Sequence, residues 1–331
     1  MFLSGVIFLL LTVTRMRRMI IDAVPMDLKH AIVVGMGAFI AFVGMRNCGI
    51  IVADAATFVT LGNLGAPQTL LAISGLFLTG ALIALRVPGS MVVGIIVVSC
   101  AGMALGISPL PQGRVFEPLP PLPVEVFGQL DIKGALQHGI ISIVFTLTMV
   151  DLFDNMGVLI GLSQKAGFLH GDGHIDNLDK ALVTDSIATM ASAVMGATTA
   201  TSYLECAAGV AEGGRTGLTA VTIAGLFFLT LFFIPLVALV PAYATAPVLI
   251  VVGGMMMQDI VHIRFQDFSV ALPAFLTIMC MPLTFNIATG FGFGCICWVG
   301  LRICMGRFRE LHIVTVCIAL CFVINFALRM P

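Results

Sequence analysis

Three acidic residues lie inside two of the most apolar stretches of this chain. Asp151 and Asp154 occur in MVDLFDNMG, where the apolar run GIISIVFTLTMV ends, and Glu205 occurs in ATTATSYLECAAG. A charged group at membrane depth costs several kcal/mol, so such groups face a bundle interior or a water-filled cavity and mark a substrate or ion path. The pattern predicts a binding site inside a membrane protein.

The two aspartates are three residues apart, so on a helix they lie on adjacent parts of one face. Two ionised carboxylates close together in a dry environment raise each other's proton affinity, which suits a proton-coupled site. We expect Asp154 to bind the ligand, because Asn155 beside it adds an amide, and Asp151 to support it. The alternative is that one of the acids lies near a helix end and is merely solvated.

Glu205 follows a run of hydroxyl residues, and Gly196 before that run offers a break. Unwound backbone at membrane depth is tolerated only where it lines a cavity or is covered by protein, and half-helix ends there bind polar ligand groups. With Glu205, the residues expected to line the ligand are Thr199, Thr201 and Ser202. Asp185, in the small-residue stretch ALVTDSIATMASAVMG, is a candidate supporting acid. The alternative is that Glu205 pairs with a distant basic residue, although no Lys or Arg is expected deep within a span.

The composition is that of a membrane protein. Of the 331 residues, 59% are hydrophobic and 10% are charged, whereas roughly a quarter would be charged in a soluble domain. The net charge of -1 says nothing about partners, and the sequence shows no basic face on which nucleic acid could bind. The nine cysteines lack metal-site spacing, and the polar stretch HGDGHIDNLDK is interpreted as a solvated loop. No metal and no cofactor are expected, with a proton as the coupling ion.

Apolar runs separated by Gly, Pro or charge predict an all-α polytopic bundle. The predicted spans lie near residues 1–14, 30–45, 68–85, 89–106, 138–162, 180–196, 197–212 (broken), 217–239, 244–260, 268–284, 286–304 and 312–328. A cluster of Arg15, Arg17, Arg18 and Lys29 after the first span indicates a cytoplasmic loop by the positive-inside tendency.

Four stretches resemble the AzgA-like branch of the nucleobase/cation symporter superfamily, the purine base permeases. They are VDLFDNMGVLIG, TSYLECAAGVAEGGRTGLTAV, LVPAYATAPVLIVVGG and LPAFLTIMCMPLTFNIATG. The resemblance implies an inverted-repeat transporter with core and gate domains and a broken helix that carries a short strand. It matches Asp154 and Glu205 to the two acids that hold the purine and help couple its movement to protons. It also implies that the first three membrane segments are absent, an N-terminal truncation relative to the family.

The resemblance implies a division of the chain into five parts. They are 1–14, the end of the fourth segment and a core remnant; 15–106, gate segments of the first repeat; 107–135, a Pro-rich extracytoplasmic loop; 136–240, core segments of the second repeat with the substrate site; and 241–331, gate segments of the second repeat. Asn155, Met156, Val158 and Cys206 depart from the residue types usual in the family, which bears on the choice of base.

These observations favour proton-coupled uptake of purine nucleobases such as adenine, guanine or hypoxanthine across the inner or plasma membrane. The expected partners are the nucleobase and membrane lipid, with a homodimer left open. Alternatives are an inactive or partial permease remnant, a related anion permease, and an intramembrane aspartyl protease. The protease lacks support because Gly171–Asp172–Gly173 lies in a polar loop and the Gly-x-Gly-Asp pattern is missing.

Overall fold

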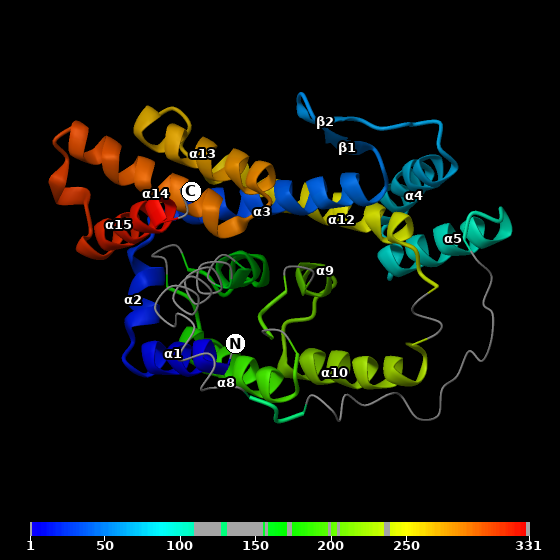
Figure 1. Cartoon of the computed structure of the whole chain (residues 1–331), viewed down its shortest axis with the longest axis horizontal. Helices are drawn as coiled ribbons and strands as arrows, with labels where there is room; N and C mark the ends of the chain where they lie inside the picture. Colours follow the sequence, from blue (N-terminus) through cyan, green and yellow to red (C-terminus); the bar gives the residue numbers. More distant parts are fainter. Residues whose placement is uncertain are drawn as a thin grey trace. The chain divides into compact units, whose positions relative to one another are not determined.

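The computed structural model describes most of the chain, and its described part is mainly helical with one two-stranded sheet (Figure 1). The described residues are 2–108, 127–130, 155, 158–170, 174–197, 200–203, 206–234 and 239–328. The chain divides into two compact units, each discontinuous in sequence. The first comprises Met1–Met36, Pro123–Val210 and Met257–Pro331, and the second comprises Gly37–Leu122 and Ala211–Met256.

The first unit contains the N-terminal helices, the helix that precedes Glu205, and the C-terminal helices. Its elements are α1 (Phe2–Val13), α2 (Met16–Ala23), the first half of α3 (Met26–Asn47), α8 (Leu178–Val194), α9 (Cys206–Ala211, whose last residue falls in the second unit), η1 (Met257–His262), α13 (Phe268–Thr284), α14 (Ile287–Cys304), η2 (Phe308–Glu310) and α15 (Ile313–Leu328).

The second unit contains the rest of α3 and the hairpin that follows it. Its other elements are β1 (Ile51–Asp54), β2 (Phe58–Leu61), α4 (Pro67–Ala84), α5 (Ser90–Ala104), α10 (Gly217–Phe232) and α12 (Ala242–Met256). Tyr243 of α12 packs in a buried cluster with Cys48, Ala72 and Val98. Its hydroxyl lies 2.6 Å from the Ser108 hydroxyl, which satisfies both buried groups.

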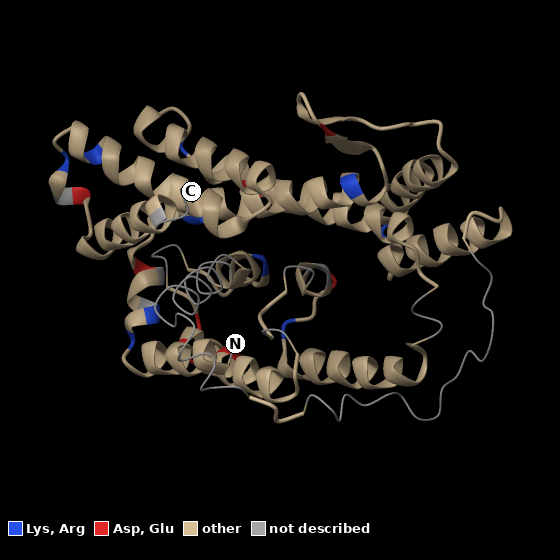
Figure 2. Ribbon diagram, viewed as in Figure 1, with Lys and Arg blue, Asp and Glu red and all other residues tan. Residues whose placement is uncertain are grey.

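The prediction of apolar helical segments is confirmed in the described part of the chain. The spans expected near 68–85, 268–284 and 312–328 are α4, α13 and α15. Four described helical stretches are long and apolar enough to cross a membrane: Met26–Asn47, Pro67–Ala84, Ala242–His262 and Ile287–Cys304. Long parts of these helices carry no Lys, Arg, Asp or Glu (Figure 2). The span expected over 138–162 lies mostly outside the described residues.

Two local features were not predicted from the sequence. The charged stretch after the first span contains α2, an amphipathic helix of sequence MRRMIIDA, and its Arg17 is buried. The hairpin β1–β2 was not expected from the sequence. Asp54 closes its turn, because one carboxylate oxygen accepts the N–H groups of Ala56 and Thr57 at 2.8 and 2.9 Å. The same contacts, the one from Thr57 first, hold the pKa of Asp54 below its usual value.

Helices α13 and α14 pack closely through small residues. A Cβ on Gly290 would lie 2.8 Å from the Met281 backbone nitrogen, and a Cβ on Gly294 would overlap the Thr277 hydroxyl. Small residues let helix backbones approach in membranes, where packing replaces the hydrophobic effect as the force between helices. The core beside this contact includes Ala31, Val34, Val270, Ala274, Trp298 and Ala319.

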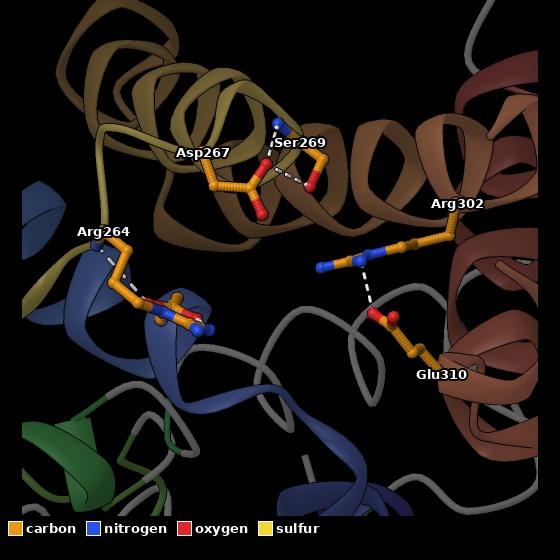
Figure 3. A network of polar contacts seen from close by, with 6 residues as sticks. Arg264, Asp267, Ser269, Arg302 and Glu310 are labelled. Carbon is orange, nitrogen blue, oxygen red and sulfur yellow. Dashed lines mark hydrogen bonds and ion pairs between the residues drawn. The ribbon is translucent and has the colours of Figure 1, made fainter.

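Charged side chains form ion pairs and a helix cap near the ends of α13 and α14 (Figure 3). Arg264 pairs with Asp27 of α3, its Nε lying 3.2 Å from one carboxylate oxygen, and Arg302 pairs with Glu310. The pairing with Asp27 raises the pKa of Arg264. Asp267 caps α13 by accepting the Ser269 hydroxyl and N–H at 2.7 and 3.0 Å, and these bonds lower the pKa of Asp267. Arg302 is itself buried, with its guanidinium 4.5 Å from the centre of the Trp298 ring.

Candidate functional site

The predicted site residues divide into two groups. Asp151, Asp154, Thr199 and Glu205 lie outside the described residues, so their predicted roles stay predictions. Asn155, Asp185, Thr201 and Ser202 are described. The structure therefore describes residues beside the two acids, namely Asn155, Thr201 and Ser202, but not the acids themselves.

Asn155, the residue after Asp154, is almost fully buried, with 1% of its surface exposed. Neither its amide nitrogen nor its amide oxygen has a hydrogen-bond partner in the part of the chain that the structure describes. A buried amide without partners is unfavourable by about 1–3 kcal/mol, and such groups in native proteins call for an explanation. A ligand with both donors and acceptors would satisfy it.

Helix α8 carries Asp185, which forms a buried ion pair with Arg17 of α2. Arg17 Nη2 lies 2.8 Å from Asp185 Oδ2, and the two side chains are 0% and 4% exposed. Arg17 Nη1 also lies 3.4 Å from the Ser186 hydroxyl, and its guanidinium lies 4.7 Å from the centre of the Phe8 ring. Asp185 is thus a partner of Arg17, a residue whose burial the sequence did not indicate.

The same helix holds the segment that leads to Glu205. Ser192 Oγ accepts the backbone N–H of Ala200 at 3.2 Å, and the Thr189 hydroxyl donates to the Ala200 carbonyl at 3.4 Å. Asp185, Thr189 and Ser192 have the spacing of one helix face, and all three are buried. One face of α8 therefore binds both α2 and the start of the 200–203 segment.

The helix interruption predicted before Glu205 is confirmed for the described residues between α8 and α9. α8 ends at Val194, residues 200–203 are neither helix nor strand, and α9 begins at Cys206. The short strand that the resemblance implies is not formed by Thr201 and Ser202. The backbone of Ala200, just before them, bonds to side chains of α8. Both residues are half-buried, as expected for residues that line a partly enclosed surface.

The arrangement suits recognition of a polar ligand by hydrogen bonds. One predicted acid is followed directly by a buried amide without partners among the described residues, and the other is preceded by hydroxyl residues in a segment that α8 fixes. Non-helical backbone at membrane depth is found where it lines a cavity or is covered by protein. These properties suit a site that binds a polar ligand.

Comparison with known proteins identifies the class. The protein family described as the permease family matches residues 1–293 of this chain. The chain belongs to this family. The membrane character of its helices and the family membership agree, so this permease is a membrane transporter rather than an enzyme.

Named relatives of this permease cover almost its whole length. It is 46% identical over 325 residues to a putative permease of Methanocaldococcus jannaschii, a match covering 98% of this chain and 74% of the relative. It is 39% identical to the adenine permease AdeQ of Escherichia coli, covering 99% and 73%. It is 38% identical to the guanine/hypoxanthine permease PbuO of Bacillus subtilis, covering 98% and 76%. The permease thus spans about three quarters of the length of these relatives.

Proposed function

We propose that this permease takes up purine nucleobases, such as adenine, guanine or hypoxanthine, together with protons across the cell membrane. The observation that carries the proposal is the identity of 38–39% to an adenine permease and a guanine/hypoxanthine permease over nearly the whole chain. The two predicted acids and the buried amide beside one of them supply groups suited to a purine.

In this proposal Asp154 and Glu205 hold the base from two different segments. A purine base presents ring nitrogens and exocyclic amino or carbonyl groups that donate and accept hydrogen bonds. A carboxylate accepts from N–H groups, and the Asn155 amide both donates and accepts. Thr199, Thr201 and Ser202 line the base on the side of Glu205. Recognition through several buried polar groups is selective, because an analogue that lacks one hydrogen bond leaves a buried group unpaired.

Proton coupling follows from the spacing of the acids. A carboxylate in apolar surroundings beside a second carboxylate binds a proton more readily than one in water. Asp151 would raise the proton affinity of Asp154 in this way, so that the base and a proton are bound together. The segments over 136–240 would then move as a core against the gate segments over 15–106 and 241–331.

The test is uptake by the purified permease reconstituted in liposomes. We expect radiolabelled adenine, guanine or hypoxanthine to accumulate when the outside is made acidic, and accumulation to collapse when a protonophore removes the pH gradient. Accumulation that ignores the gradient would contradict proton coupling. Absence of any purine uptake by folded protein would contradict the function and favour an inactive permease.

A further inference from the structure

A second polar cluster lies apart from the proposed nucleobase site, at the ends of two candidate membrane spans. It joins His30, in the second turn of α3, to Asp259 and His262 of η1. One ligand atom from each residue lies within 4.8 Å of the others. The two imidazole rings stack, with centres 5.1 Å apart and planes 21° apart, and His262 Nδ1 lies 3.8 Å from Asp259 Oδ1. All three belong to the first unit.

Gln164 completes the cluster from a fourth position in the chain. Its amide nitrogen lies 3.0 Å from His30 Nδ1 and 3.0 Å from Asp259 Oδ1. An amide N–H donates, so His30 Nδ1 accepts and carries no proton in this arrangement. A histidine that is neutral and faces a carboxylate has the form in which imidazole binds metals.

The amide oxygen of Gln164 is the unusual atom. It is buried and has no hydrogen-bond partner among the described residues. The amide nitrogen, not this oxygen, faces His30 and Asp259, so the oxygen would reach an ion bound there only after the amide rotates by half a turn. Three possible ligand atoms, one each from His30, Asp259 and His262, converge within 4.8 Å of one another beside this amide.

From this convergence, we propose that His30, Asp259 and His262 bind a divalent first-row transition metal ion, with the Gln164 amide oxygen or water as a fourth ligand. Two imidazoles and one carboxylate are borderline ligands that suit Zn²⁺, Co²⁺ or Ni²⁺, whereas Mg²⁺ and Ca²⁺ prefer oxygen alone. Ligand atoms lie about 2.0–2.2 Å from zinc, so the donors must draw slightly closer than 4.8 Å. The His262 side chain is 58% exposed and would have to rotate out of its stack on His30 to bring a nitrogen to the ion.

Two acidic residues, Asp27 and Asp259, lie near the histidines, and their ion pairs indicate which of them can bind the metal. Asp27 also lies near the start of α3, but its carboxylate pairs with Arg264 through two nitrogens. That pairing occupies Asp27 and leaves Asp259 as the acid that faces both imidazoles. The site therefore joins α3 to η1, and a bound ion would replace the hydrogen bonds that now tie Gln164 to both elements.

The test is metal binding by the purified full chain in detergent, prepared without a polyhistidine tag and without nucleobase. Titration with Co²⁺ should give the visible absorption of a low-coordinate site, and Zn²⁺ should displace it at one equivalent. His262→Ala and Asp259→Asn should each weaken binding on the order of tenfold or more, since changing even an outer partner of a metal site costs about 10–100-fold. Elution volume and thermal stability in metal-free buffer show that each variant is folded.

Two matched histidine variants serve as controls. His312→Ala removes an exposed histidine near Asp22, and His170→Ala removes one that pairs with Asp176 at 3.1 Å. Neither should change the affinity. Affinity unchanged in both His262→Ala and Asp259→Asn, or lost instead in His170→Ala, would overturn the proposal. Because nucleobase is absent, either result leaves the proposed transport function untouched.

Discussion

Buried polar residues are the most informative individual groups in this permease. Both amide atoms of Asn155 are buried without a hydrogen-bond partner among the described residues, whereas Asp185 forms an ion pair with Arg17. The ion pair satisfies only one Asp185 oxygen, since Oδ1 is buried without a partner among the described residues. An unpaired amide can gain energy from a ligand, while a paired acid stabilises the fold around it.

The Arg17–Asp185 pair gives a prediction about stability. Asp185→Ala leaves a buried guanidinium without its partner, and we expect destabilisation by about 3–5 kcal/mol. The double variant Arg17→Met with Asp185→Leu removes both charges and should recover most of that loss, because a buried ion pair is often no better than apolar packing. Thermal unfolding of the purified variants measures both.

Asp176→Ala is the control for this series. Asp176 pairs with His170 at 3.1 Å, and about half of each side chain is exposed, so its loss should cost less than about 1 kcal/mol. If Asp185→Ala were as mild as Asp176→Ala, or if the double variant were less stable than both single variants, the buried pair would not stabilise the contact between α2 and α8.

The burial of Arg17 could not be predicted from the sequence. In RMRRMIIDA it looks like one of several positive charges beside a span, which is typical of a cytoplasmic loop. Its burial depends on α8, far away in the sequence, which brings Asp185 and Ser186 to it. The proximity of His30 and Asp259 could not be predicted from the sequence either, because neither residue lies in a recognisable metal motif.

At the scale of elements, apolar runs sufficed to locate the long helices, because a span must satisfy its backbone internally and so reads as continuous apolar sequence. α13 begins and ends where the sequence predicted, and Asp267 caps its start. α2 was missed because its eight residues carry three charges and show helical periodicity over only two turns. The hairpin was missed because each strand has four residues and its turn depends on a side chain, Asp54.

The packing of α13 against α14 gives a second prediction. Gly290→Ala would place a Cβ 2.8 Å from the Met281 nitrogen and 2.9 Å from the Thr277 carbonyl oxygen. Backbone atoms cannot rotate away, so the helices must separate, at an expected cost of about 1–3 kcal/mol. Unfolding temperature and the yield of monodisperse protein measure the effect.

Gly300→Ala, on the same helix, is the matched control. No described atom lies within 4 Å of its added Cβ, so the variant should gain up to about 1 kcal/mol from helix propensity. Equal stability of the two alanine variants would mean that the backbones of α13 and α14 do not approach closely at Gly290.

At the scale of the whole molecule, the chain combines charge-poor helices, an interrupted segment before Glu205 and membership of the permease family. The helical membrane class could be predicted from the composition and the apolar runs, and the family from four stretches that resemble purine base permeases. The hydrogen bonds that hold the interrupted segment could not be predicted from the sequence, because they depend on which face of α8 lies towards Ala200.

The central claim is that Asp154 and Glu205 bind a purine nucleobase, and equilibrium binding of radiolabelled purine to the purified permease tests it most directly. We predict saturable binding that unlabelled adenine, guanine or hypoxanthine displaces. Asp154→Asn and Glu205→Gln should each weaken it at least about 30-fold, since losing a charged hydrogen-bond partner costs about 2 kcal/mol or more. Glu212→Gln, at an exposed position seven residues after Glu205, should bind normally. Unchanged purine binding in both site variants would contradict the account.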